Sequence, residues 1–154
     1  RLPNIDLIIE GKDLLKTATK SHGTLELQKG YDWTGDGQLF FDNPHGKDAW
    51  LEFTFPVAKE ELRQLTLRAT YSYDYGTYRI LLDGQPVREP IDFYSAALKV
   101  RELNLGQRRL SVGNHKIRLE CTGTNGQSRG ARLGIDSVRL RQRWDVKRES
   151  PKDM

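Results

Sequence analysis

Aromatic, amide and charged side chains gather in turn-rich segments of the sequence. Trp33 lies among the glycines and aspartates of residues 31–37, and Asn125 lies in the polar stretch 122–130. Aromatic rings stack on the C–H faces of sugars, and Asp, Asn and Arg side chains supply the hydrogen bonds that sugar hydroxyls need. Loops that display such residues on a rigid scaffold favour carbohydrate binding. The candidate residues are Tyr31, Trp33, Asp74, Tyr75, Tyr94, Asn125 and Arg129.

The same residue types also have a plainer interpretation, in which rings pack inward and polar side chains only cap turns. Tyr71 and Tyr78 lie in alternating apolar rows, which favours the core. Both interpretations stay open for Trp33, whereas the loop setting of Tyr75 and Asn125 favours binding.

Signatures of catalysis and of transition-metal binding are weak. None of His22, His45 and His115 stands in a metal-ligand spacing, and the turn residues around His45 and His115 predict solvent-exposed side chains. The sequence contains no nucleophile elbow, phosphate-binding loop or dinucleotide fingerprint. A glycosidase needs only a pair of carboxylates, but nothing singles out a pair among the 21 acidic residues. We therefore predict a protein that is not an enzyme, with a small polysaccharide hydrolase as an alternative.

Length and composition limit which other classes of protein this chain could belong to. A length of 154 residues suits one core, and 25 basic against 21 acidic residues give a formal charge of +4, far from a nucleic-acid-binding composition. We predict no membrane span, because no run of 18 apolar residues occurs. The single cysteine, Cys121, excludes an internal disulfide and occupies an inward strand position. The first residues show no signal peptide, so we expect a cytosolic chain, a mature product or an excised piece.

Basic residues cluster near the end of the sequence. Residues 129–148 carry seven Lys and Arg against two Asp, and Arg139, Arg141 and Arg143 alternate along one strand face. A solvated outer face explains this cluster, and an anionic partner such as an acidic glycan is the functional alternative.

Short alternating segments must position these residues. Apolar residues recur at every second position in residues 24–28, 51–55, 65–73, 78–82, 103–105, 117–121 and 133–141. Asp83-Gly84 predicts a hairpin turn, and a change of period near Asp136 predicts a bulge. Residues 58–62 are compatible with either a helical turn or a loop. We predict an all-β fold, an antiparallel β-sandwich or jelly roll, over residues 1–145. The polar segment 146–154 is predicted to be a tail or linker.

Several short motifs follow one another in a characteristic order. They are Ile8-Ile9-Glu10-Gly11-Lys12-Asp13-Leu14, the Trp33 loop, Trp50-Leu51-Glu52-Phe53, Asp74-Tyr75-Gly76, Leu82-Asp83-Gly84, Gly113-Asn114-His115 and Gly134-Ile135-Asp136-Ser137-Val138-Arg139-Leu140. Their order and spacing resemble the galactose-binding-like β-sandwich carbohydrate-binding modules, especially the calcium-bearing jelly-roll type. The resemblance extends from about residue 6 to residue 141.

The resemblance implies a non-catalytic module that targets an attached polysaccharide-active enzyme to its glycan. The implied partners are a polysaccharide or oligosaccharide and a catalytic domain, and the implied location is secreted, extracellular or periplasmic. A structural or protein-interaction domain on the same scaffold is the alternative. Such modules often bind in loops at one end, with a stacking aromatic (here Tyr31 or Trp33) and an amide before the last strand (here Asn125). Other members use a concave face.

The resemblance also implies a structural calcium ion at Glu10 on the first strand and Asp136 on the last. Carboxylates and backbone carbonyls suit a hard cation of this kind. The family often carries a second acid two residues after the first, but this sequence has Lys12 there, and its charge repels a divalent ion. A hydrogen-bonded structural aspartate is therefore the open alternative at Asp136.

Overall fold

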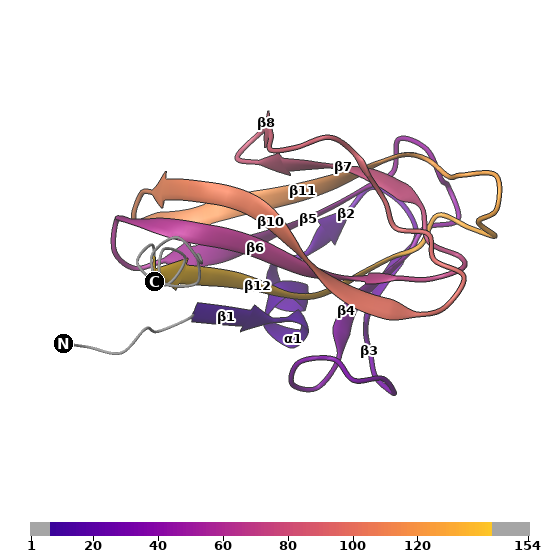
Figure 1. The fold of residues 1–154 in the computed structure, drawn as a ribbon, viewed down its shortest axis with the longest axis horizontal. Helices are drawn as coiled ribbons and strands as arrows, with labels where there is room; N and C mark the ends of the chain where they lie inside the picture. The colour runs from indigo at the N-terminus through magenta and orange to yellow at the C-terminus, as the bar shows by residue number, and fades with distance from the viewer. Residues whose placement is uncertain (1–6, 143–154) are drawn as a thin grey trace, which may run out of the picture.

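The computed structural model describes residues 7–142 and shows two antiparallel sheets packed face to face (Figure 1). The predicted all-β sandwich is confirmed. In spatial order, the first sheet contains β10 (Lys99–Leu110), β6 (Glu61–Tyr71), β12 (Leu133–Gln142), β4 (Gln38–Asp42) and β3 (Thr24–Gln28), with β1 (Leu7–Glu10) also paired to β12. The second contains β2 (Thr19–Lys20), β5 (Trp50–Val57), β11 (Gly113–Gly123), β7 (Thr77–Leu82) and β8 (Gln85–Pro86), with β9 (Ile91–Asp92) also paired to β7.

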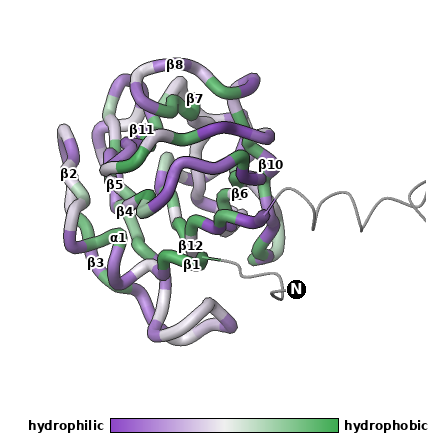
Figure 2. The backbone as a smooth tube through the Cα atoms, turned by 90° about the vertical axis from the view of Figure 1, so that its left-hand side faces the viewer, coloured by the Kyte–Doolittle hydropathy of each residue, from purple (hydrophilic) through white to green (hydrophobic). Residues whose placement is uncertain are grey.

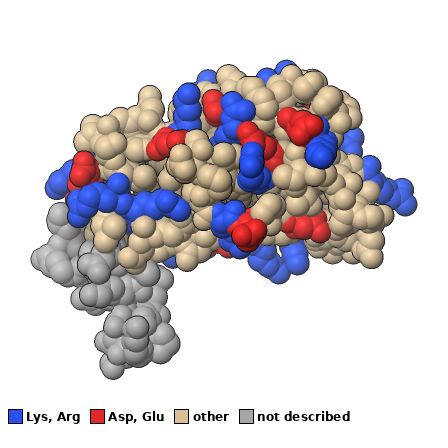
Figure 3. All heavy atoms as spheres, turned by 90° about the horizontal axis from the view of Figure 1, so that it is seen from above, with Lys and Arg blue, Asp and Glu red and all other residues tan. Residues whose placement is uncertain are grey.

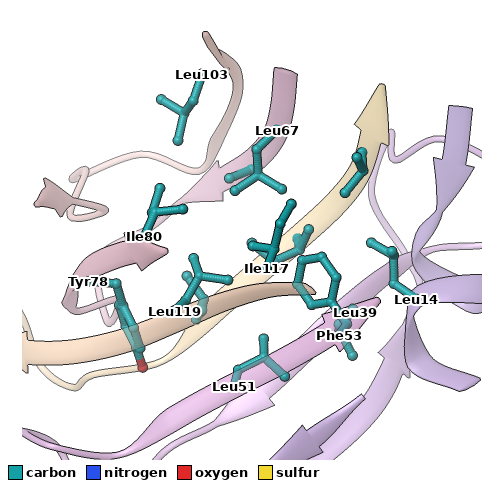
Figure 4. Packing of buried hydrophobic residues seen from close by; sticks show 14 of the residues in the cluster. Leu14, Leu39, Leu51, Phe53, Leu67, Tyr78, Ile80, Leu103, Ile117 and Leu119 are labelled. Carbon is teal, nitrogen blue, oxygen red and sulfur yellow. The ribbon is translucent and has the colours of Figure 1, made fainter. Parts of the chain in front are cut away.

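The core lies between the two sheets. Burial alternates along β5 and β11 of the second sheet, whereas β4, β6 and β12 of the first sheet contain continuous buried runs. Phe53 of β5 and Leu119 of β11 are fully buried from the second sheet, and Leu67 of β6 is fully buried from the first (Figure 4). Each such side chain stabilises the fold by about 1.5–3 kcal/mol through burial alone. Figure 2 shows hydrophobic and hydrophilic segments interspersed along the chain.

The sequence did not predict the helix, and the loop alternative at residues 58–62 was the better one. Within residues 7–142 the helix is α1 (Gly11–Thr17), whereas residues 58–62 form a bend and the start of β6. Leu14 anchors α1 in the core, and Asp13 in its first turn and Lys16 in its last favour the helix dipole. No described helix has the length and apolar content needed to cross a membrane.

The predicted hairpin turn and bulge are both present. Asp83 and Gly84 adopt positive φ values of 49° and 86° between β7 and β8. The pairing of β12 with β6 shifts register between Ile135 and Ser137, which leaves Asp136 at the bulge. This bulge lets Asp136 bury its side chain on the last strand.

The histidine predictions were only partly right. His22 and His45 are exposed and stack on each other at 3.8 Å between ring centroids. His115 is 7% exposed on β11, because its ring is held between the Asp83 carboxylate and the Ser111 carbonyl. Cys121 is a buried free thiol, as predicted.

Charged side chains of both signs are interspersed on the face that Figure 3 shows. On β12, Arg139 and Arg141 share one strand face and both approach Glu102, at 3.8 and 3.6 Å. Arg143, Lys147 and Arg148 of the basic cluster, and the predicted tail 146–154, lie outside the described residues.

Candidate functional site

The β6–β7, β9–β10 and β11–β12 connections meet at one end of the sandwich, on the right of Figure 1. The backbone amide of Arg129 donates to the Tyr73 carbonyl at 3.1 Å, and the Ser128 hydroxyl donates to the Tyr75 carbonyl at 2.7 Å. These bonds fix the β11–β12 connection against the β6–β7 corner. Four of the predicted residues, Asp74, Tyr94, Asn125 and Arg129, therefore belong to one set of interlocked loops.

The Asn125 side chain stabilises this loop end through three hydrogen bonds within the protein. Its Oδ1 accepts hydrogen bonds from the amides of Gln127 and Ser128 at 2.8 and 3.0 Å, and its Nδ2 donates to Asp92 Oδ2 at 2.7 Å. The other oxygen of Asp92 accepts from the amide of Tyr94 at 2.9 Å. Asn125 thus closes its own turn and connects it to the segment that carries Tyr94.

A polar hollow of about 350 Å³ opens between the β4–β5 and β11–β12 connections. Its walls are tied together underneath by Tyr78, whose hydroxyl accepts from Asn43 Nδ2 at 3.1 Å and donates to the Ala131 carbonyl. The lining residues are Asp42, Asn43, Pro44, Gly46, Thr124, Arg129, Gly130, Ala131 and Arg132. Because buried hydrogen bonds hold both walls, the hollow is formed before any ligand binds.

Arg132 is the best-fixed charge at the hollow. Its Nε lies 3.1 Å from Asp42 Oδ1 and its guanidinium also contacts Asp74 Oδ2 at 3.2 Å. Both carboxylates keep oxygen lone pairs that are not used by Arg132, because an ionised carboxylate has about four acceptor sites. The three side chains together offer donors and acceptors in fixed positions, which suits a ligand rich in hydroxyl groups.

Tyr73 is a residue that the sequence analysis missed. We assigned it to the inward row of β6, but β6 ends at Tyr71 and the corner that follows leaves Tyr73 53% exposed. Its backbone contact with Arg129 places it beside a residue that lines the hollow. The turn residues Asp74 and Gly76 were the signal that the alternation stops before this point.

Burial decides the open question at Trp33 in favour of the core, and the expectation that Tyr75 displays its ring outward is wrong. The two side chains are 8% and 4% exposed. Trp33 Nε1 donates to the Thr70 hydroxyl at 2.9 Å, which donates to Gln38 Oε1 at 2.6 Å, and Gln38 Nε2 donates to the Tyr75 hydroxyl at 3.0 Å. Each polar group finds its partner inside the protein, so both rings are buried without leaving a polar atom unpaired. Burial also raises the pKa of Tyr75.

Tyr31 remains exposed but lies elsewhere. Its side chain is 46% exposed, and its ring is tilted against that of Trp33 with 5.4 Å between centroids. The β3–β4 connection that carries it projects from the lower side of Figure 1, away from the β11–β12 connection. The structure therefore separates Tyr31 from the predicted residues at the loop end.

Glu10 and Asp136, the predicted calcium ligands, flank the same β3–β4 connection. Asp136 is fully buried: its Oδ1 accepts from the Thr34 amide at 2.6 Å, and its Oδ2 accepts from the Ser137 hydroxyl at 2.9 Å. Glu10 lies against Gly35, where an added Cβ would come within 2.2 Å of Glu10 Oε1. The two carboxylates therefore contact successive residues of one loop.

The donor set at this position does not fit a divalent ion. Calcium takes six to eight oxygen ligands, with carboxylates prominent among them. Here Lys12 Nζ lies 3.7 Å from Glu10 Oε1, and Arg68 Nε lies 3.5 Å from Asp136 Oδ2. Within residues 7–142 no three His, Cys, Asp or Glu side chains are grouped as a metal site would require.

The fold of this chain is similar to that of several proteins of known structure. The sequence matches no protein-family model and no curated protein. Among solved structures, a Paenibacillus xanthan lyase matches with a TM-score of 0.74 and 24% identity, over 86% of this chain and 13% of the lyase chain. A native family 35 carbohydrate-binding module from Clostridium thermocellum matches with a TM-score of 0.57 and 18% identity, over 88% of this chain and 97% of the module. The chain has the jelly-roll fold of such modules.

The same fold also occurs inside longer enzyme chains. A Podospora anserina GH26-CBM35 β-(1,4)-mannanase matches with a TM-score of 0.58 and 20% identity, over 88% of this chain and 27% of the mannanase chain. This chain therefore spans about an eighth of the lyase and about a quarter of the mannanase.

Proposed function

We propose that this chain is a non-catalytic carbohydrate-binding module and that the loop-end hollow is its glycan site. The observation that carries the proposal is the preformed polar hollow lined by Asp42 and Arg132, in which Arg132 is fixed by ion pairs to Asp42 and to Asp74 behind it. The exposed residue Tyr73 joins this region through its backbone contact with Arg129. The fold shared with family 35 modules supports it.

The hollow would recognise a sugar by hydroxyl hydrogen bonding and by ring stacking. Asp42 and Asp74 accept from sugar hydroxyls, and the guanidinium groups of Arg132 and Arg129 donate to sugar oxygens. Tyr73 offers the apolar surface on which the C–H face of a pyranose stacks. Because the hollow is shallow and buries little area, we expect a dissociation constant of about 0.1–1 mM for one site.

The biological role proposed for the module is to hold an attached enzyme on its polysaccharide. The mannanase match, whose name combines a catalytic family with a carbohydrate-binding module, supports this arrangement. A bound module raises the effective concentration of its catalytic partner at the polymer, so modest single-site affinity suffices. Since polysaccharide substrates lie outside the cell, we propose an extracellular or periplasmic location.

Two exposed tyrosines provide a matched test of the site. We expect Tyr73→Ala to weaken binding about two- to tenfold in affinity electrophoresis and calorimetry against a panel of plant and bacterial polysaccharides, because stacking contributes about 0.5–1.5 kcal/mol. Arg129→Ala should weaken it as well. Tyr31→Ala should leave binding unchanged, since Tyr31 lies on the separate β3–β4 connection.

Loss of binding in the Tyr31 variant alone would move the site to the β3–β4 connection. Failure of the wild-type protein to bind any polysaccharide in the panel would contradict the proposed function and favour a structural or protein-interaction domain.

A further inference from the structure

Two cations of the chain occupy the junction between β1, the β3–β4 connection and the bulge of β12. Lys12 approaches Glu10, and Arg68 approaches Asp136. Both carboxylates are the positions at which the calcium-bearing modules would hold their ion. Each carboxylate of this chain thus faces a positive charge that belongs to the protein itself.

We propose that Lys12 and Arg68 replace the structural calcium ion, so that ion pairs and hydrogen bonds, without a divalent metal, hold this junction together. The proposal concerns the stability of the scaffold and is independent of the glycan site, which lies at the loop end.

Asp136 is the more demanding of the two carboxylates, because it is fully buried. A buried carboxylate is costly unless it is paired and hydrogen-bonded. The Thr34 amide and the Ser137 hydroxyl satisfy one oxygen each, and the Arg68 guanidinium approaches Oδ2 at 3.5 Å. Arg68 reaches this position because its backbone pairs with Ser137, directly after the bulge. Arg68 on the neighbouring strand β6 therefore compensates the negative charge of this carboxylate.

Lys12 supplies the second charge from the start of α1. Its Nζ lies 3.3 Å from Asp36 Oδ2 and 3.7 Å from Glu10 Oε1, so it bridges the end of β1 and the β3–β4 connection. The hydrogen bond and charge of Asp36, together with the charge of Glu10, raise the pKa of Lys12 and keep it protonated. A divalent ion at this point would meet an ammonium group where calcium-bearing modules often have a carboxylate.

The test measures thermal unfolding of the wild-type protein without glycan, in a chelator and in about 10 mM calcium. We expect the two midpoint temperatures to agree within about 1 °C, because a ligand shifts the midpoint only if it binds the folded state. A calcium-dependent rise of about 3 °C or more in the wild type would overturn the proposal.

Charge reversal at Lys12 should create the calcium response that we expect the wild type to lack. In Lys12→Glu the bridging cation becomes a third carboxylate beside Glu10 and Asp36, and we expect calcium to raise the midpoint temperature of this variant by about 3 °C or more. Lys16→Glu is the matched control, because Lys16 lies on the same helix and its ion pair within residues 7–142 is with Asp13, at 3.1 Å, away from Glu10 and Asp36. An equal calcium response in both variants would contradict the role of Lys12.

Calcium binding by isothermal calorimetry on the wild-type protein keeps the proposal testable if either variant fails to fold. The expected result is no binding heat at millimolar calcium. Stoichiometric calcium binding would overturn the proposal and would leave the glycan site unaffected, so the two hypotheses fail separately.

Discussion

Tyr73 and Tyr75 stand two residues apart, yet one is 53% exposed and the other 4%. Alternation along β6 would give them the same environment, but the strand ends at Tyr71 and the corner breaks the period. Tyr75 is drawn inward by a hydrogen bond from Gln38, a partner 37 residues away in the sequence. The sequence therefore located the corner that carries these two rings. It did not reveal which ring faces solvent, because that depends on the contact with Gln38, a residue distant in the sequence.

The sequence predicted that His115 is an exposed turn residue, but in the structure its ring is buried and hydrogen-bonded. Its Nδ1 lies 2.7 Å from Asp83 Oδ2 and its Nε2 lies 2.7 Å from the Ser111 carbonyl. Both partners only accept hydrogen bonds, so both ring nitrogens donate when the imidazole is protonated. Burial lowers the pKa of His115, but these two hydrogen bonds and the charge of Asp83 outweigh it, and the net pKa is raised above the ordinary 6.5.

A pH dependence of stability follows from this raised pKa. A group whose folded pKa exceeds its unfolded value contributes stability that is fully present below the unfolded pKa and is lost as pH rises through the folded pKa. We expect the difference in free energy of unfolding between wild type and His115→Gln to be larger at about pH 5.5 than at about pH 8.5. Urea denaturation at both pH values measures it, and Asp83→Asn should reduce the difference. A gap that grows with rising pH would contradict the assignment.

Several of the long strands followed from period-two alternation, whereas β4 was missed because its burial is almost continuous. The strands that carry Leu51, Phe53 and Phe55, and later Ile117 and Leu119, bury these rows as the pattern predicts. Helix α1 was missed because seven residues between a strand and a loop are too few for helical periodicity. Its position instead depends on close packing, since a Cβ on Gly11 would come within 2.7 Å of the Gly37 carbonyl.

The pairing of β12 with β4 depends on a second close approach. A Cβ on Gly134 would lie 2.2 Å from Oε1 of the fully buried Gln38, which bonds Thr70 and Tyr75. We expect Gly134→Ala to lower the free energy of unfolding by about 1–3 kcal/mol, because it must displace that amide.

Gly126→Ala is the matched control for Gly134→Ala. A Cβ there meets no atom within 4 Å, so its effect should stay within about 0.5 kcal/mol. Equal losses of stability in the two variants, measured by urea denaturation, would contradict the packing argument.

At the scale of the whole molecule, the described part of the basic cluster is largely paired with acidic side chains. Arg139 and Arg141 share Glu102, and Arg132 contacts two carboxylates. The face that Figure 3 shows likewise carries Lys and Arg interspersed with Asp and Glu. The distinguishing surface feature of the sandwich is the polar hollow between the β4–β5 and β11–β12 connections, which the sequence indicated only through Arg129 and neighbouring loops.

The location of bound glycan on this surface is the central claim, and amide chemical-shift mapping tests it most directly. A ¹⁵N-labelled protein is titrated with an oligosaccharide of the polysaccharide that the binding panel selects. We predict that the perturbed amides concentrate in residues 42–46, 72–76 and 124–132, around the hollow. Perturbations confined to the β3–β4 connection or to the outer face of β6 and β12 would contradict it.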